Sequence, residues 1–159
     1  MIQYLLMIAG IFAGDQWIKE QIEANEPMNG KRAICDGRIT ITRHHNKGAA
    51  LNFMEKKPKI ISGVACVTFS YVIFLLRQVL TEEGSGFMKL GLSLITGGGL
   101  SNLYDRVKRG YVVDYFTINY GKLKKVIFNL ADICIFAGSF LMILEALAGG
   151  TQLGQVESV

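Results

Sequence analysis

The chain has 159 residues, of which half are hydrophobic and 19% are charged, with a formal net charge of +4. This length allows one domain or a small helical bundle, and the charged fraction lies below the roughly 25% of a typical soluble domain. The apolar residues gather in four stretches with few charges, which argues against a soluble protein with buried helices and favours helices that cross a membrane.

The first predicted helix covers about 1–22 and is uncharged up to Asp15. It lacks a basic n-region and a small-residue cleavage site, so we expect a retained helix and not a signal peptide. Asp15 and Lys19 are four residues apart, so they share a helix face and can form an ion pair. The simplest interpretation is an interfacial pair at the membrane end of this helix.

A polar and basic loop, about 25–57, follows the first helix. In DGRITITRHHN, Ile39 and Ile41 alternate with Thr40 and Thr42, which is a period-two pattern of β-branched residues. We therefore predict a small β-sheet or hairpin that lies on the membrane surface. The sequence NKGAALNF comes next, and its small residues allow close backbone approach.

Three further membrane helices are predicted at about 58–80, 87–105 and 126–148. Pro58 lies in the first turn of the second helix, where proline is tolerated. Gly97, Gly98 and Gly99 would allow neighbouring helices to pack closely against the third helix. A second extended loop covers about 107–125, and a polar tail covers 149–159. The predicted fold is an all-α integral membrane protein with four transmembrane helices and a small β-rich loop domain.

Two aspartates lie in apolar surroundings, Asp114 in YVVDYF and Asp132 in VIFNLADICIFAG. A charged side chain within a membrane costs several kcal/mol, so such residues are rare and usually functional. A pair of carboxylates that share one proton is the chemistry of aspartic proteases. Asp114 and Asp132 are therefore the candidate catalytic pair.

Polar clusters at the membrane edges support this interpretation. Asn102 reaches the helix face of Asp105 and Arg106, and Asn129 is three residues before Asp132. We expect each amide to donate a hydrogen bond to the aspartate of its own motif. Any single cluster could instead join helices as polar contacts do in membranes. The pair Asp15 and Lys19 and the motif around Asn46 bring the number of such clusters to four, and four in so short a chain favour a functional site.

Other catalytic classes fit poorly. The three cysteines form no disulfide framework, and the two adjacent histidines, His44 and His45, lie in a loop without an HExxH or CxxC motif. We expect no metal and no cofactor. A serine-type intramembrane protease would need a histidine on a helix, and a prepilin-type aspartic peptidase would need a GxGD motif.

Taken together, the segments resemble the lipoprotein signal peptidases, the type II signal peptidases of bacteria. The matching motifs are DQWIK at 15–19, NKGAA at 46–50, GGGLSNLYDRVKRGYVVDYF at 97–116 and FNLAD at 128–132. The match covers nearly the whole chain in the order of the family. Leu51, Asn52 and Ser101 depart from residues that are frequent at their positions in the family.

The resemblance implies an aspartic endopeptidase that cleaves diacylglyceryl-modified prolipoproteins before the lipidated cysteine. By motif, Asp114 and Asp132 would be catalytic, and Asn46 and Arg106 would contact the substrate. The supporting residues would be Asp15, Lys19, Gly48, Asn102, Asp105 and Asn129. Membrane lipids are expected partners, nucleic acid is not, and nothing in the sequence demands more than a monomer. Which aspartate holds the proton, and whether Asp105 is catalytic or structural, stay open.

The resemblance also implies a cytoplasmic membrane protein whose site faces the extracytoplasmic side. The charge distribution conflicts with this orientation, since 15 of the 17 Lys and Arg residues lie in 19–59 or 106–125. The positive-inside rule, applied literally, would place those loops in the cytoplasm. The basic loops could instead contact anionic lipid headgroups. A small transporter with a relay through Asp15 and Asp132, or an assembly protein, would be the alternatives, but the halves show no repeat.

Overall fold

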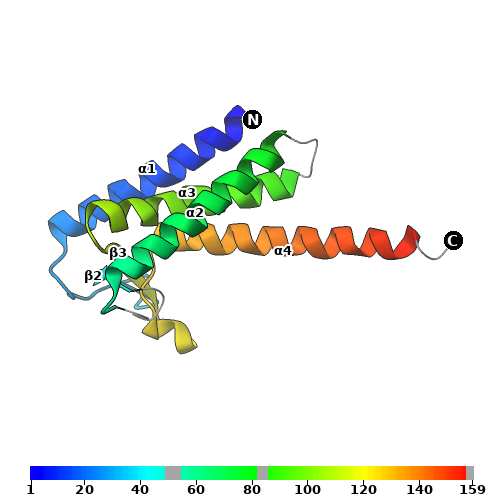
Figure 1. The fold of residues 1–159 in the computed structure, drawn as a ribbon. Coiled ribbons are helices and arrows are strands. Elements are labelled where there is room, and N and C mark those ends of the chain that lie inside the picture. The colour runs from blue at the N-terminus through cyan, green and yellow to red at the C-terminus, as the bar shows by residue number, and fades with distance from the viewer. Residues whose placement is uncertain (49–54, 82–85, 157–159) are drawn as a thin grey trace.

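A computed structural model describes residues 1–48, 55–81 and 86–156 of the chain, with side chains described as far as Ala148. Four long helices form a bundle with a small sheet at one end, and the start of the first helix and the end of the fourth lie toward the other end (Figure 1). The helices are α1 (Ile2–Asn25), α2 (Pro58–Thr81), α3 (Gly86–Lys108) and α4 (Leu130–Val156). The remaining elements are β1 (Arg32–Ile34), β2 (Ile39–Asn46), β3 (Val112–Ile118) and the 3-10 helix η2 (Gly121–Lys125).

The predicted helix positions agree closely with the structure for the first three helices. The fourth differs at both ends. It begins at Leu130 and not at 126, because Phe128 still pairs with Phe116 of β3. It continues to Val156 through the predicted polar tail. Residues 149–156 contain no proline, which would break the helix.

Two helices in the described part of the chain are long and apolar enough to cross a membrane, Pro58–Thr81 and Leu130–Ala148. Little of either helix is buried inside the protein. Large apolar side chains are instead exposed along them, with Val67 at 73% and Leu147 at 67% of their surface accessible. Such a continuous apolar exterior marks a surface that contacts something other than water.

Helix α3 is the centre of the bundle, and its three consecutive glycines explain why. A Cβ atom at Gly97 would meet Ile11 of α1, one at Gly98 would meet the carbonyl oxygen of Ala131 in α4, and one at Gly99 would touch Phe69 of α2. Each glycine therefore lets a different helix approach α3.

The sheet has the antiparallel order β1-β2-β3. The predicted strand around 39–46 is present as β2. The second extended loop predicted over 107–125 contains a strand, since Val112–Ile118 forms β3 and pairs with β2. Asp114 therefore lies in a strand and not in a loop or at a helix end, directly opposite His44. The β-branched and aromatic residues of VVDYFTI are typical of a strand and could have revealed it.

Candidate active site

Asp114 lies within β3 and only 4% of its surface is exposed. Its two carboxylate oxygens each accept a hydrogen bond from an asparagine amide. Asn46, at the end of β2, donates to Oδ2 at 3.0 Å, and Asn129 donates to Oδ1 at 2.8 Å. The sheet pairing brings Asn46 to this position, because β2 runs antiparallel beside β3.

Asp132 lies in the first turn of α4, where it forms a reciprocal cap with Asn129. The Asn129 side chain accepts a hydrogen bond from the Asp132 backbone N–H at 2.9 Å, and Asp132 Oδ2 accepts one from the Asn129 backbone N–H at 3.1 Å. This arrangement is a capping box, which satisfies two backbone donors at the helix start. Asp132 Oδ1 accepts a further hydrogen bond from Asn102 Nδ2 at 2.9 Å.

The amides cross between motifs, which corrects the pairing expected from sequence. The side-chain amide of Asn129 donates to Asp114, and that of Asn102 donates to Asp132. Asn129 also donates to Asn102 Oδ1 at 3.2 Å. The two amides thus form a continuous hydrogen-bonded link between the two carboxylates.

The environment of Asp114 favours its protonated form. Burial, followed by the negative charge of Asp132, raises the pKa of Asp114 from 3.8 to about 7. The hydrogen bonds from Asn46 and Asn129 and the positive charge of Lys19 oppose this rise. The carboxyl group of Asp114 can therefore hold a proton near neutral pH.

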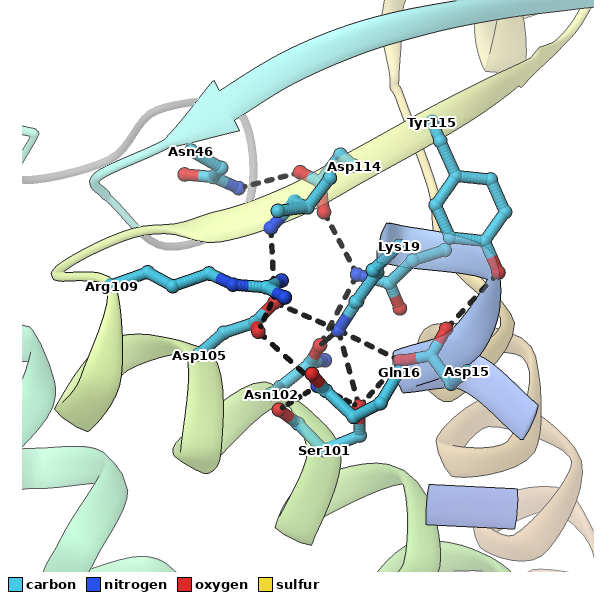
Figure 2. Close-up of polar contacts among 12 residues, drawn as sticks. Asp15, Gln16, Lys19, Asn46, Ser101, Asn102, Asp105, Arg109, Asp114 and Tyr115 are labelled. Carbon is cyan, nitrogen blue, oxygen red and sulfur yellow. Dashed lines mark hydrogen bonds and ion pairs between the residues drawn. The ribbon is translucent and has the colours of Figure 1, made fainter. Parts of the chain in front are cut away.

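Beside the two carboxylates lies a closed ionic network centred on Lys19 (Figure 2). The Lys19 ammonium group lies 2.7 Å from Asp15 and 3.0 Å from Asp105, and all three side chains are fully buried. Asp105 also pairs with Arg109 at 2.9 Å. The interfacial interpretation of the Asp15 and Lys19 pair is therefore wrong: the pair lies inside the protein, where two carboxylates balance two cations.

Asp105 belongs to this network and not to the carboxylate pair. Besides its two cations, it accepts hydrogen bonds from the Gln16 side chain at 3.2 Å and from the Val113 backbone N–H at 3.1 Å. It therefore joins α1, α3 and the start of β3. Its guanidinium partner is Arg109, four residues later in the sequence.

Arg106 and Asn46 meet through the backbone of Gly48. Arg106 Nη2 donates to the Gly48 carbonyl oxygen at 2.8 Å, and the Gly48 N–H donates to Asn46 Oδ1 at 3.0 Å. The chain beyond β2 is therefore tied to α3 beside Asp114. The remainder of this motif, including Leu51 and Asn52, lies outside the described residues.

A pocket of about 340 Å³ opens between α2, α3 and α4. Its walls are almost entirely apolar, and the polar residues among those that line it are Thr68, Asn102 and Arg106. Because Asn102 also bonds Asp132, the pocket reaches the candidate site. Its other lining residues include Ile61, Val64, Phe69, Val72, Leu103 and Ile135.

The sequence did not single out several residues of the site. Gln16, Ser101, Arg109 and Tyr115 all bond to the buried network. Only Arg109 left a usable signal, its i,i+4 spacing from Asp105. Among the described residues, no group of three His, Cys, Asp or Glu side chains could hold a metal ion.

The match to a known protein family includes the residues of the candidate site. Positions 7–148 match the family model described as signal peptidase (SPase) II. A lipoprotein signal peptidase of Lactiplantibacillus plantarum is 31% identical over 147 residues, which cover 91% of this chain and 93% of the relative. One from Caldicellulosiruptor bescii is 33% identical over 159 residues, covering 94% and 95% of the two chains.

Two solved structures, both described as bacterial membrane enzymes determined by the in meso method, have the same fold. The first has a TM-score of 0.85 and 25% identity, covering 96% of this chain and 92% of the other. The second has a TM-score of 0.80 and 26% identity, covering 92% and 94%.

Proposed function

The chain belongs to the signal peptidase II family, as its motifs predicted, and from that membership we propose an aspartic endopeptidase that cleaves diacylglyceryl-modified prolipoproteins. The bond cut is the one before the lipidated cysteine. One observation carries the proposal: Asp114 and Asp132, distant in sequence, are linked through the amides of Asn129 and Asn102. Such a link holds two carboxylates in a fixed relation, as a proton-sharing pair requires.

In this mechanism Asp114 holds the shared proton and Asp132 is ionised. The raised pKa of Asp114 supports this assignment. Asp132 takes a proton from a bound water, whose oxygen attacks the scissile carbonyl carbon. Asp114 gives its proton to the carbonyl oxygen. When the tetrahedral gem-diol collapses, the C–N bond breaks, the leaving amine takes up the proton held by Asp132, and one diol hydroxyl group returns its proton to Asp114, which restores the pair.

Substrate binding is assigned to the polar end and the apolar pocket beside the pair. Asn46 and Arg106 flank Asp114 through Gly48 and would contact the peptide backbone or the lipid head region. The pocket between α2, α3 and α4 would take an apolar part of the substrate. Anchoring the substrate in this way makes the attack effectively intramolecular.

We assign four membrane spans to the chain. The helices α1 and α3 have 24 and 23 residues, long enough to cross about 30 Å of hydrocarbon at 1.5 Å per residue. Three of their charged residues, Asp15, Lys19 and Asp105, are fully buried in ion pairs, which lowers the cost of placing these three at membrane depth. An even number of spans puts both termini on the same side of the membrane. We assign the termini to the cytoplasm and the candidate active site to the extracytoplasmic side.

The basic residues near the sheet then face anionic lipid headgroups. The 3-10 helix η2 carries Lys122, Lys124 and Lys125, all exposed, just before the apolar helix α4 begins. Lysines at this depth attract anionic headgroups by about 1 kcal/mol each. The active unit is assigned as a monomer.

The test is cleavage of a diacylglyceryl-modified prolipoprotein by the purified protein in detergent, followed by the loss of signal-peptide mass on a gel. We expect wild type to cut with and without a chelator. Asp114→Asn and Asp132→Asn should each abolish cleavage, whereas Asp105→Asn should retain some in whatever fraction folds. Asp36→Asn is the matched control, because Asp36 is exposed in a turn at φ 53°, a conformation that asparagine also tolerates.

Wild type that cuts nothing, or a double variant Asp114→Asn, Asp132→Asn that still cuts, would contradict the proposal. Cleavage that the chelator stops would contradict the two-aspartate mechanism. Cleavage of a prolipoprotein that lacks the diacylglyceryl group at the same rate would contradict the proposed substrate class.

A further inference from the structure

Tyr115 follows Asp114 in β3, and successive residues of a strand point to opposite faces. Tyr115 is only 6% exposed and packs in an apolar cluster with Ile22 and Val113, although the same strand presents a carboxylate at the preceding position. A buried tyrosine usually finds a hydrogen-bond partner for its hydroxyl group. The Tyr115 hydroxyl has two partners, one in α1 and one at the start of α4.

The hydroxyl group of Tyr115 donates to Asp15 Oδ1 at 3.0 Å (Figure 2). The same oxygen accepts a hydrogen bond from the Leu130 backbone N–H at 2.8 Å. Burial and the adjacent negative charge of Asp15 raise the pKa of Tyr115 above its usual value, so the group keeps its proton. A protonated hydroxyl has one donor, and Asp15 uses it, which leaves the oxygen lone pairs for Leu130.

Leu130 is the first residue of α4, and its N–H is one of the backbone donors that a helix start leaves without an internal partner. The side chain of Asn129 accepts a hydrogen bond from the N–H of Asp132, which lies two residues after Leu130. Tyr115 satisfies the N–H of Leu130 from a different element. The first turn of α4 is therefore held by its own cap and by β3.

We propose that Tyr115 is a positioning residue for the proposed peptidase reaction: its hydroxyl group fixes the first turn of α4, which carries Asp132, against the strand that carries Asp114. The geometry is direct. Tyr115 is one residue from Asp114 along β3, and Leu130 is two residues from Asp132 along α4. The hydrogen bond at 2.8 Å from Leu130 N–H to the Tyr115 hydroxyl acts together with the backbone bonds between Phe116 and Phe128 to hold the two segments in place. The bond to Asp15 anchors the hydroxyl to α1.

The effect on catalysis rests on the proposed function, so the test has two readouts. Tyr115→Phe keeps the buried ring and removes only the hydroxyl group. We expect kcat to fall about 10-fold to 100-fold, as for a misplacement of catalytic groups by a fraction of an ångström, with KM within about twofold of wild type. A fall in the folded fraction alone would lower the active enzyme concentration, so kcat is normalised to folded protein.

The second readout is amide hydrogen exchange in detergent, which needs no activity. Peptides that cover the start of α4 should exchange faster in Tyr115→Phe than in wild type, whereas peptides from the middle of α2 should not change. Tyr120→Phe is the matched control, because Tyr120 is 79% exposed. It should leave both readouts as in wild type.

If Tyr115→Phe does not fold, 2,3-difluorotyrosine at position 115 keeps the hydroxyl but weakens it as an acceptor. Exchange at the start of α4 should then rise to a smaller extent, and kcat should fall in parallel. Unchanged kcat, a change confined to KM, or unchanged exchange at the start of α4 would overturn the proposal. If wild type is inactive but the start of α4 exchanges faster in Tyr115→Phe, the proposed function is contradicted and the structural role of Tyr115 stands.

Discussion

Asn102 lies between Lys19 and Asp132 and bonds to both. Its Oδ1 accepts a hydrogen bond from the Lys19 ammonium group at 3.0 Å, while its Nδ2 donates to Asp132 Oδ1 at 2.9 Å. An ammonium group has donors only, so Lys19 determines which way the amide faces. The nitrogen of Asn102 must then turn toward Asp132. The buried ion network and the carboxylate pair are therefore one connected structure.

Removal of Lys19 should destabilise the fold strongly. Lys19→Met would leave Asp15 without its cation and Asp105 with Arg109 alone. Breaking a buried ion pair from one side typically costs about 3–5 kcal/mol. We expect a large fall in Tm, measured by thermal denaturation in detergent. Lys31→Met is the control, since Lys31 is exposed. Equal Tm values for the two variants would show that the network does not support the fold.

Cleavage should decline as pH rises through about 7, since the pKa of Asp114 is about 7 and the shared proton is lost above it. The measurement is kcat across the neutral range with wild-type enzyme. Replacing Asn46 removes a hydrogen bond that lowers the pKa of Asp114, so the decline in Asn46→Ala should move to higher pH. A profile that stays flat from pH about 6 to about 8 would contradict the assignment of the proton to Asp114.

The same raised pKa has a consequence for stability. Folded Asp114 binds a proton up to about pH 7, whereas in the unfolded chain its pKa is near 3.8. The stability that this proton contributes is complete below the unfolded pKa and is lost as pH rises through the folded pKa. Asp114→Asn carries no such ionisation. The difference in Tm between Asp114→Asn and wild type should therefore shift in favour of the variant as pH rises from about 4 to about 7 and stay level above that, and a constant difference across this range would argue against a raised pKa.

Gly98→Ala should damage both packing and activity. The added methyl group would meet the carbonyl oxygen of Ala131, immediately before Asp132. Overpacking of this kind costs about 1–3 kcal/mol, and here it would also displace the first turn of α4. Gly63→Ala is the matched control, because its methyl group would meet nothing within 4 Å. Thermal denaturation and kcat are measured for both, and equal behaviour would contradict the close approach of α3 and α4.

Replacement of lysines in η2 should weaken the response to anionic lipid. We expect wild type to have a higher Tm in phosphatidylglycerol vesicles than in phosphatidylcholine vesicles, and Lys124→Gln with Lys125→Gln to reduce this difference. The control removes two exposed cations elsewhere, Lys31→Gln with Arg38→Gln. If both double variants lose the response equally, the effect is one of net charge and not of η2.

Elements that depend on neighbouring residues were predicted from the sequence, whereas elements that depend on pairing with distant residues were not. The apolar stretches predicted the first three helices closely, because a helix of this length is determined by its own hydrogen bonds and side chains. The start of α4 was placed too early, since Phe128 is as apolar as the helix but pairs with Phe116 of β3. The strand that carries Asp114 was missed, because it lies in a segment expected to be a loop and pairs with β2, far away in sequence.

By itself, the sequence determined the family, the helical character and the identity of the candidate carboxylates, since each rests on residue type and order. Only the tertiary structure decided which partner each side chain has. Asn129 was expected to serve Asp132 by proximity, yet its amide reaches Asp114, and the Asp15 and Lys19 pair expected at an interface is buried. Helical spacing fixes which residues share a face, but helix packing decides what that face meets. The hydrogen bonds of Tyr115 and Ser101 could not be predicted from the sequence for the same reason, because their partners lie on other elements.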